Sequence, residues 1–307
     1  AGGGAKVITA TADGNLATGQ TVILQSNGTV KAAGLDSVTE ALGTAVEFDS
    51  ATIYYMMNVS DTSASKVVVF YRDGGNSNYA TAIVGTISGT SVSFGSKVVL
   101  NAATIESMSG AYDSIQNKIV IAYRDGGDSD NLNCVVGTIS GTSISFGAES
   151  EIASNNPSDQ SMTFDSNAGK FVIFYKDTSD SGYGKCRVLT VSGDSVSAGT
   201  ITVVESHSGF NVFQDGSCFD SSNNKVILTS SFNNGSAIRA YVGTISGTSI
   251  SFGSFVTVHG SSGYYPVSCF DTTNNKVIIA YEDIAASGQG KAAVGTVSGT
   301  SMSVGSA

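Results

Sequence analysis

Gly85-Thr-Ile-Ser-Gly-Thr-Ser91 decides the fold, because this seven-residue stretch returns at a nearly fixed interval along the chain. Copies begin at Gly137, Gly243 and Gly295, and a degraded copy begins at Leu189, so the starts lie 52, 52, 54 and 52 residues apart. A second marker keeps the same period: Asp61…Lys66, Asp113…Lys118, Asp165…Lys170, Asp220…Lys225 and Asp271…Lys276. Repeats of this length that are built from short strands are typical of propellers and solenoids.

One repeat, read over residues 95–146, contains short apolar segments separated by turn residues. We expect strands at 97–100, 109–113, 118–123 and 133–139, after which 143–146 leads into the next repeat. The segment 118–123 is almost continuously apolar, which suits a strand that is buried on both faces. Four strands per repeat, with Gly, Asn and Asp at the turns, predict a propeller blade.

Five complete repeats lie between about Gly43 and Ser301, and Val304-Gly305 begins a partial sixth. The sequence therefore predicts an all-β fold: a five-bladed β-propeller of about 52-residue, four-stranded repeats over residues 41–307. An open solenoid would need polar capping repeats at its ends, and neither end has one. We therefore expect a closed ring in which the last blade covers the first.

Residues 1–40 do not fit the repeat and predict a small N-terminal β arm. Lys6–Thr11 is expected to be a strand, and residues 21–24 and 29–32 are expected to form a hairpin around Asn27-Gly28. Asn-Gly supplies the positive φ angles that a tight hairpin turn needs. With little core of its own, this arm is expected to dock on the ring, on another copy of the chain or on another protein.

Composition excludes several partners. The formal net charge is −10, which argues against a nucleic-acid backbone as the main partner. No apolar run approaches the roughly 18 residues that a membrane-spanning helix needs. The four cysteines, Cys134, Cys186, Cys218 and Cys269, replace small and mostly apolar residues of the other repeats, so we expect buried free thiols.

The repeats resemble a known group of proteins. Their V-G-T-I-S-G-T-S-I-S-F-G cassettes and N-N-K-V-I-I-A-Y segments resemble propeller-like repeats in virion proteins of tailed bacteriophages, especially tail fibres and appendages of marine phages. The arm, Ala17–Val30, is similar to short β-modules of phage fibre and capsid-decoration proteins. The resemblance implies a structural or host-recognition role at the virion surface or outside the cell, with other virion proteins as partners. It brings no functional residues with it.

Acidic loops after the third strand are the first candidate sites. Asp125, Asp128 and Asp130 place several carboxylates close together, as a Ca²⁺ site requires, although the loop lacks the terminal Glu of an EF-hand. The alternative is that each Asp accepts amide hydrogen bonds in its own turn while Gly-Gly supplies unusual φ angles. We expect no other cofactor.

Exposed aromatics beside charged residues are the second candidate, because saccharides stack on flat apolar rings next to polar groups. Tyr79 and Tyr183 share one repeat position, and Tyr264-Tyr265 lies between strands of the last repeat. The alternative is scattered surface tyrosine. The full set of candidate ligand-binding residues is Arg72, Asp73, Tyr79, Arg124, Asp125, Lys176, Asp177, Tyr183, Tyr264 and Tyr265.

Two further features concern the repeats themselves. The marker Asp occurs in every repeat, so we expect it to close its own turn, and the residue before it is usually aromatic and is expected to pack between blades. The fourth repeat departs from the others, with three extra residues before Asp220 around Ser206–Phe213. Such broken symmetry marks either a unique binding face or drift.

Catalysis has little support in the sequence. Only two histidines occur, His207 and His259, and no nucleophile or metalloprotease motif is present. Three hypotheses remain in order of preference. The first is a non-enzymatic structural protein of a tailed-phage virion (a fibre, appendage or capsid decoration) that acts in host attachment or surface recognition, with host surface glycans among its expected partners. The second is a secreted bacterial lectin or adhesin that binds glycans through blade-rim loops. The third is a polysaccharide-degrading propeller enzyme.

Overall fold

The computed structural model describes residues 11–13, 16, 22–24, 26–27, 29–32, 43–154 and 156–305. The chain divides into two compact units, Ala1–Thr44 and Ala45–Ala307. In the first, β1 (Val22–Leu24) and β2 (Val30–Ala32) pair antiparallel, which confirms the expected hairpin. The amide of Thr29 donates to Oδ1 of Asn27 at 3.0 Å, so Asn27 helps to close the turn. Residues 6–10 of the strand expected over Lys6–Thr11 lie outside the described part of the chain.

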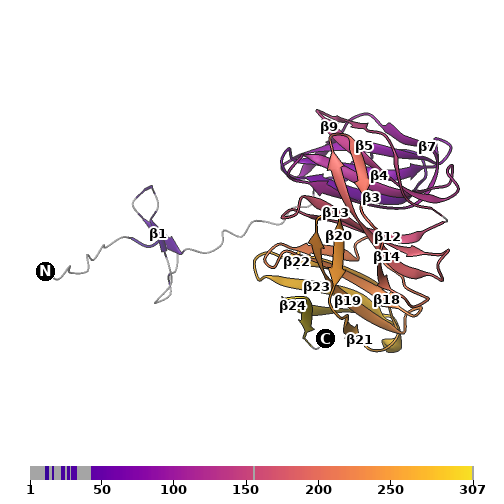
Figure 1. Cartoon of the computed structure of the whole chain (residues 1–307). Helices are drawn as coiled ribbons and strands as arrows, with labels where there is room; N and C mark the ends of the chain where they lie inside the picture. The colour runs from indigo at the N-terminus through magenta and orange to yellow at the C-terminus, as the bar shows by residue number, and fades with distance from the viewer. Residues whose placement is uncertain are drawn as a thin grey trace. The chain divides into compact units, whose positions relative to one another are not determined.

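The second unit consists of five antiparallel blades that follow one another in chain order, from indigo to yellow (Figure 1). Blade 1 contains β3 (Ile53–Asp61), β4 (Lys66–Asp73), β5 (Tyr79–Ser88) and β6 (Ser91–Phe94). Blade 2 contains β7 (Val98–Asp113), β8 (Lys118–Asp125), β9 (Asn131–Ser140), β10 (Ser143–Phe146) and β11 (Ser150–Ala153). Blade 3 contains β12 (Ser158–Asp165), β13 (Lys170–Asp177), β14 (Tyr183–Ser192), β15 (Ser195–Ala198) and β16 (Thr202–Glu205).

The last two blades repeat this plan. Blade 4 contains β17 (Ser217–Asp220), β18 (Lys225–Phe232), β19 (Ala237–Ser246), β20 (Ser249–Phe252) and β21 (Val256–His259). Blade 5 contains β22 (Gly263–Asp271), β23 (Lys276–Asp283), the 3-10 helix η1 (Ile284–Ala286), β24 (Gln289–Ser298) and β25 (Ser301–Val304). The all-β class and the five blades expected from the repeats are confirmed. No helix among the described residues has the length and apolarity to cross a membrane.

One strand assignment from the sequence was wrong. Residues 97–100 do not form the first strand of their own repeat, because Val98 and Val99 pair with Ala82 and Thr81 at the edge of blade 1. The short strand β6 covers only the second half of β5, which leaves the first half of β5 with open hydrogen-bonding groups. The next segment of chain pairs with that half, and β11, β16 and β21 do the same in blades 2 to 4. Each of these outer edges is therefore composite.

The two repeat markers have structural roles. Oδ1 of the marker Asp accepts the amide two residues later at 2.8–2.9 Å in every blade, which confirms the expected turn. The marker Lys donates from Nζ to the hydroxyl of the Thr in the G-T-I-S cassette, at 2.6–2.9 Å. The turn and the third strand of each blade are thereby joined by side chains that the repeat retains.

Acid is expected to destabilise the propeller through the turn that Asp61 closes. Burial raises the pKa of Asp61, but the Ser63 hydroxyl, Tyr112 and the amides of Ser63 and Ala64 outweigh it, so the pKa lies below its ordinary value of 3.8. The folded-state pKa is therefore lower than the unfolded one. The stabilisation is complete above the unfolded value and is lost as the pH falls through the folded value. We expect urea midpoints that are similar at pH 7 and pH 5 and fall below about pH 4.

The matched variant for this prediction is Asp61→Asn, which keeps an acceptor oxygen and cannot ionise. Its midpoint should fall less steeply in acid than that of the wild type. An unchanged acid slope would mean that Asp61 has no part in the loss.

Successive blades are joined by buried apolar clusters. Blades 1 and 2 share one around Phe70 and Ile121, blades 2 and 3 one around Cys134 and Phe171, and the later pairs repeat the arrangement. The residue before the marker Asp packs against these clusters as Tyr112, Phe164, Phe219 and Phe270, as expected. The core among the described residues thus comprises four similar interfaces between blades and a fifth cluster on blade 1 around Tyr71.

A glycine contact joins the outer edges of neighbouring blades. Gly95, Gly147, Gly199 and Gly253 follow the outer strands β6, β10, β15 and β20. A Cβ on any of them would lie 1.8–2.0 Å from the carbonyl oxygen of a turn residue in the next blade: Thr142, Asp194, Thr248 or Thr300. The backbones approach so closely that no side chain fits between them.

The closed ring that we expected is not seen. Within residues 43–154 and 156–305, no buried cluster joins blade 5 to blade 1. On blade 1, Phe48 packs over Tyr71 and Phe94, with ring centroids 5.4 and 5.5 Å apart. The face of blade 5 turned away from blade 4, here called the distal face, carries Val267, Cys269, Ile278, Ala280, Ala292 and Val294.

The burial of each cysteine depends on whether its face of the blade is covered. The four cysteines are free, and Cys134, Cys186 and Cys218 are buried as expected. Cys269 is exposed, contrary to expectation, because it lies on the uncovered distal face.

Candidate functional site

A left-handed residue on the innermost strand is repeated in four of the five blades. Tyr55, Ser107, Asp159 and Tyr265 have φ angles of 48°, 44°, 48° and 52° and stand six positions before the marker Asp. The strand pairing shifts register at each of them, which marks a β-bulge. Such a φ costs a non-glycine residue about 1–3 kcal/mol and is found mostly at functional sites, as are bulges that redirect a side chain.

These bulges meet where the inner strands converge. A cavity of about 190 Å³, here called the axial pocket, takes its walls from four blades. It is lined by Tyr55, Ser107, Met108, Asp159, Gln160, Val212, Phe213 and Gln214. Gln214 occupies the same repeat position in blade 4 as the bulge residues of the other blades. The pocket therefore combines two aromatic rings with carboxylate, amide and hydroxyl groups.

Some of these polar groups hold the blades together. The amide of buried Gln160 donates to the carbonyl oxygens of Ser107 at 3.2 Å and Ala122 at 3.1 Å, and its oxygen accepts from the Ser107 hydroxyl at 3.1 Å. Gln160 therefore fixes blade 3 against blade 2. The side chains of Tyr55 and Gln214 make no hydrogen bond to the described residues and are exposed. They are available to a ligand.

A basic side chain stands beside the carboxylate of the pocket. Nζ of Lys176 lies 3.9 Å from Oδ2 of Asp159 and donates to Oδ1 of Asn211 at 2.9 Å. Burial raises the pKa of Asp159, and the charges of Lys176 and Arg124 lower it in part, so the pKa lies above its ordinary value. This mouth of the propeller thus presents acceptors and donors side by side.

The extra residues of the fourth repeat, around Ser206–Phe213, contribute to the pocket. Phe210 and Val212 are fully buried and anchor the longer loop between blades 3 and 4. The backbones of Asn211 and Ser231 exchange hydrogen bonds of 3.1 and 2.9 Å. The anchored loop places Phe213 against Tyr265, with ring centroids 5.0 Å apart. The broken symmetry therefore adds an aromatic side chain to one site.

The structure divides the candidate residues into two groups. Arg72 and Arg124 pair across the strands with Tyr54 and Glu106, directly beside the bulges, as Lys176 does with Ser158. The Arg72 guanidinium lies over the rings of Tyr54 and Tyr55, 4.7 and 4.8 Å from their centroids. Tyr264 is half-buried and its hydroxyl donates to the Asn234 carbonyl. Arg72, Arg124, Lys176, Tyr264 and Tyr265 thus lie near the mouth of the pocket.

The other candidates lie farther out and form turns. Oδ1 of Asp73, Asp125 and Asp177 accepts an amide two residues later, at 2.9, 2.7 and 3.0 Å. Tyr79 and Tyr183 are half-buried at the starts of β5 and β14. The expected unusual φ angles are not at Gly74-Gly75 but at Ser77 and Asn78. Glycine is required at position 74 because a larger residue would not fit. A Cβ at Gly74 would lie 2.7 Å from the Thr52 carbonyl oxygen.

The three carboxylates considered for Ca²⁺ have separate partners. Besides the turn of Asp125, Oδ2 of Asp128 accepts from the Asn133 amide at 3.3 Å, and Asp130 lies 3.4 Å from Nε of Arg124. No group of three or more His, Cys, Asp and Glu side chains within the described ranges is arranged to hold a metal ion.

Several residues of the pocket were not among the sequence candidates: Tyr55, Asp159, Phe213 and Gln214. For Tyr55, Asp159 and Gln214 the signal was the fixed offset of six residues before the marker Asp, where side chains change from repeat to repeat, and for Phe213 it was the longer loop of the fourth repeat. A bulge with positive φ at Tyr or Asp is set by the sheet around it and leaves no local sequence signature.

Comparison with known proteins supports the architecture. No protein-family model and no curated protein matches the sequence. The BP39L lectin from Burkholderia pseudomallei superposes with a TM-score of 0.60 at 11% identity, over 84% of this chain and 71% of the lectin. Aleuria aurantia lectin gives 0.49 at 12% identity, over 82% and 75%. An exo-β-1,3-galactanase from Phanerochaete chrysosporium gives 0.48 at 11%, over 87% and 70%. At such identity the first likeness establishes the propeller fold alone.

Proposed function

We propose that this protein is a non-enzymatic, glycan-binding β-propeller that recognises host surface saccharides through the axial pocket. The observation that carries the proposal is the convergence of repeat-equivalent bulge residues from different blades on one small cavity. Tyr55 and Phe213 offer apolar ring faces for the C–H surfaces of a sugar. Asp159 and Gln214 offer acceptors and a donor for its hydroxyl groups.

The carboxylates of the pocket favour binding over hydrolysis. Most glycoside hydrolases need two carboxyl groups, about 5–5.5 Å or about 6.5–9.5 Å apart, on either side of the scissile bond. Asp159 is the only Asp or Glu among the described residues that line the axial pocket. Within the axial pocket a bound saccharide would therefore meet one carboxylate, Asp159, and no second one from the described residues.

Placement on a phage particle is the second half of the proposal, and the likeness of the repeats to those of tail fibres and appendages supports it. The small hairpin unit would contact other virion proteins. Mass spectrometry of density-purified phage particles should then find this chain in proportion to capsid protein. Its recovery only from cell-free supernatant or cell surfaces would favour a secreted lectin or adhesin.

The binding test uses a glycan array followed by calorimetry with the strongest hit. Tyr55→Ala and Phe213→Ala are each expected to weaken binding at least tenfold, which corresponds to about 1.4 kcal/mol. Each removes one ring face of the axial pocket. Incubation of the ligand with the wild type should release no shorter saccharide.

Tyr183→Ala is the matched control, because Tyr183 is an aromatic candidate at the blade rim that does not line the axial pocket. Its affinity should equal that of the wild type. Loss of binding in this variant, with retention in Tyr55→Ala, would move the site to the rim loops. Thermal melts of all variants would separate loss of binding from loss of fold.

A further inference from the structure

The distal face of blade 5 is hollowed where the other blades are filled. Ile278, Ala280, Ala292 and Val294 stand at the repeat positions of Val120, Ala122, Cys134 and Val136, which are fully buried between blades 2 and 3. On blade 5 no sheet covers them, and Val294 is 47% exposed. A groove of about 530 Å³ crosses this face.

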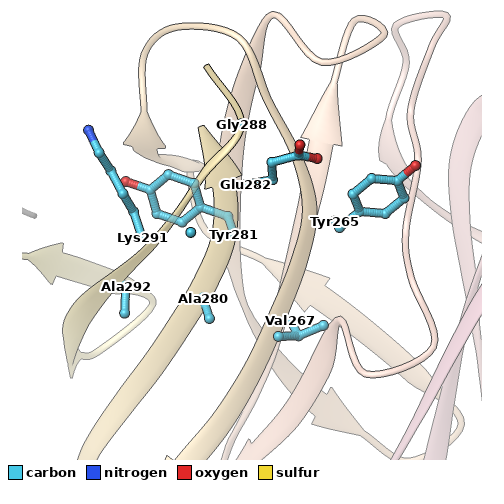
Figure 2. Close-up of a pocket in the computed structure, with 9 residues that line it drawn as sticks. Tyr265, Val267, Ala280, Tyr281, Glu282, Gly288, Lys291 and Ala292 are labelled. Atoms are coloured by element: carbon cyan, nitrogen blue, oxygen red, sulfur yellow. The ribbon is translucent and has the colours of Figure 1, made fainter. Parts of the chain in front are cut away.

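The groove has one apolar side and one polar side (Figure 2). Ala292, Ala280 and Val267 lie in a row, and the tips of Glu282 and Tyr265 lie opposite them. Lys291 borders the groove but pairs across the strands with Tyr281 and points toward blade 4, where Asp283 lies 2.7 Å from its Nζ. Gly288 leaves room beside Glu282, because a Cβ at Gly288 would lie 3.0 Å from Oε1. An apolar strip beside the Glu282 carboxylate and the Tyr265 hydroxyl suits the alternating C–H and hydroxyl surfaces of a sugar.

Tyr265 connects this groove to the axial pocket. It lines the groove, is 61% exposed and is the bulge residue of blade 5, and its ring lies 5.0 Å from that of Phe213, which lines the pocket. Its neighbour Tyr264 is held by the Asn234 carbonyl and covers Gly235, where a Cβ would lie 2.2 Å from the Tyr264 ring. The backbone that carries Tyr265 is therefore held on one side by blade 4.

We infer that the ligand is a saccharide chain of several units, which runs from the axial pocket past Phe213 and Tyr265 into the groove of the distal face. This inference rests on the proposed function. Continuity through Tyr265 and the Glu282 carboxylate inside the groove favour a saccharide over a second copy of the chain. A protein–protein contact here would bury Glu282, for which the described residues supply no salt bridge.

The test is calorimetry of the full chain with gluco-, galacto-, manno- and xylo-oligosaccharides of one to six units. For the series that binds, the affinity should rise at least tenfold between one unit and the longer chains. Ala292→Leu, which fills the groove, should abolish this rise. Ala102→Leu is the matched control, since Ala102 is equally classed as exposed and lies outside the groove, and it should keep the rise.

The outcomes separate the two proposals. An affinity that does not change with chain length would overturn the inference and leave the axial site standing. No binding at any length, on any series or on the glycan array, would remove the proposed function as well. Light scattering after gel filtration tests the rival occupant. A wild-type dimer that Ala292→Leu converts to a monomer would assign the groove to a second copy and overturn the inference.

Discussion

Gly147→Ala is expected to lower the free energy of unfolding by about 3 kcal/mol, at the upper end of the usual cost of overpacking. The new Cβ would lie 1.9 Å from the Asp194 carbonyl oxygen in the turn of the next blade. Both partners are backbone, so neither can turn away as a flexible side chain would. Blades 2 and 3 must therefore separate at their outer edges, and this should appear as a lower urea midpoint.

Gly305→Ala provides the control, because Gly305 holds the same repeat position in blade 5 and meets no backbone of another blade among the described residues. A Cβ there would lie 3.8 Å from the Val294 carbonyl oxygen of its own blade. We expect a change within about 0.5 kcal/mol, as for an ordinary surface substitution. Equal losses in both variants would show that the backbone conformation, and not the contact between blades, requires glycine.

Arg239→Met is expected to cost about 3 kcal/mol. The guanidinium lies between two rings, 3.2 Å from the centroid of Phe232 and 3.8 Å from that of Phe255. Its Nη1 pairs with Glu205, which also accepts from the Tyr241 hydroxyl at 2.9 Å. The side chains of Arg239 and Glu205 are only 15% and 13% exposed, so the variant leaves a mostly buried carboxylate without its cation.

The double variant Arg239→Met, Glu205→Leu tests whether the unpaired Glu205 carboxylate causes the loss of stability. Removing both charges should recover most of the loss, because the cost comes from the unpaired carboxylate more than from the missing ion pair. Chemical denaturation of the wild type, both single variants and the double variant gives the coupling energy. A double variant less stable than Arg239→Met would indicate that the stacking of Arg239 between the two rings dominates.

Most of the fold could be predicted from the sequence of the repeats. The marker Asp predicted its own turn, because that turn depends on residues close in sequence, and the aromatic before it predicted the packing between blades, because four of the five repeats keep it. The composite outer edges were not predicted, since the pairing of Val98 with Ala82 is decided by which half of β5 the short strand β6 leaves open. It was likewise not predicted that the distal face of blade 5 stays uncovered, because closure of the ring depends on the angles between blades.

The candidate site was less predictable for a related reason. Asp73, Asp125 and Asp177 were candidate ligand-binding residues in the sequence. In the structure their carboxylates accept hydrogen bonds inside their own turns. Arg72, Lys176 and Tyr265 were among the candidates and lie near the mouth of the axial pocket, whereas Tyr55 and Phe213 were not among them. Tyr55 and Phe213 come together only because separate blades converge, and the fixed offset before the marker Asp and the longer loop of the fourth repeat were the visible signs of it.

The four bulge residues and Gln214 place side chains at the mouth of the propeller but not in the buried clusters between blades. Tyr55, Gln214 and Tyr265 are exposed, and Ser107 and Asp159 are only partly buried, so none of the five belongs to the buried clusters that join the blades. Each also comes from a different blade. Ser107 bonds Gln160 between blades 2 and 3, so exchange at Tyr55, Asp159, Gln214 or Tyr265 would change the chemistry of the mouth one side chain at a time while the buried contacts between blades stay the same. A library designed to alter what the axial pocket binds would therefore begin at these four positions.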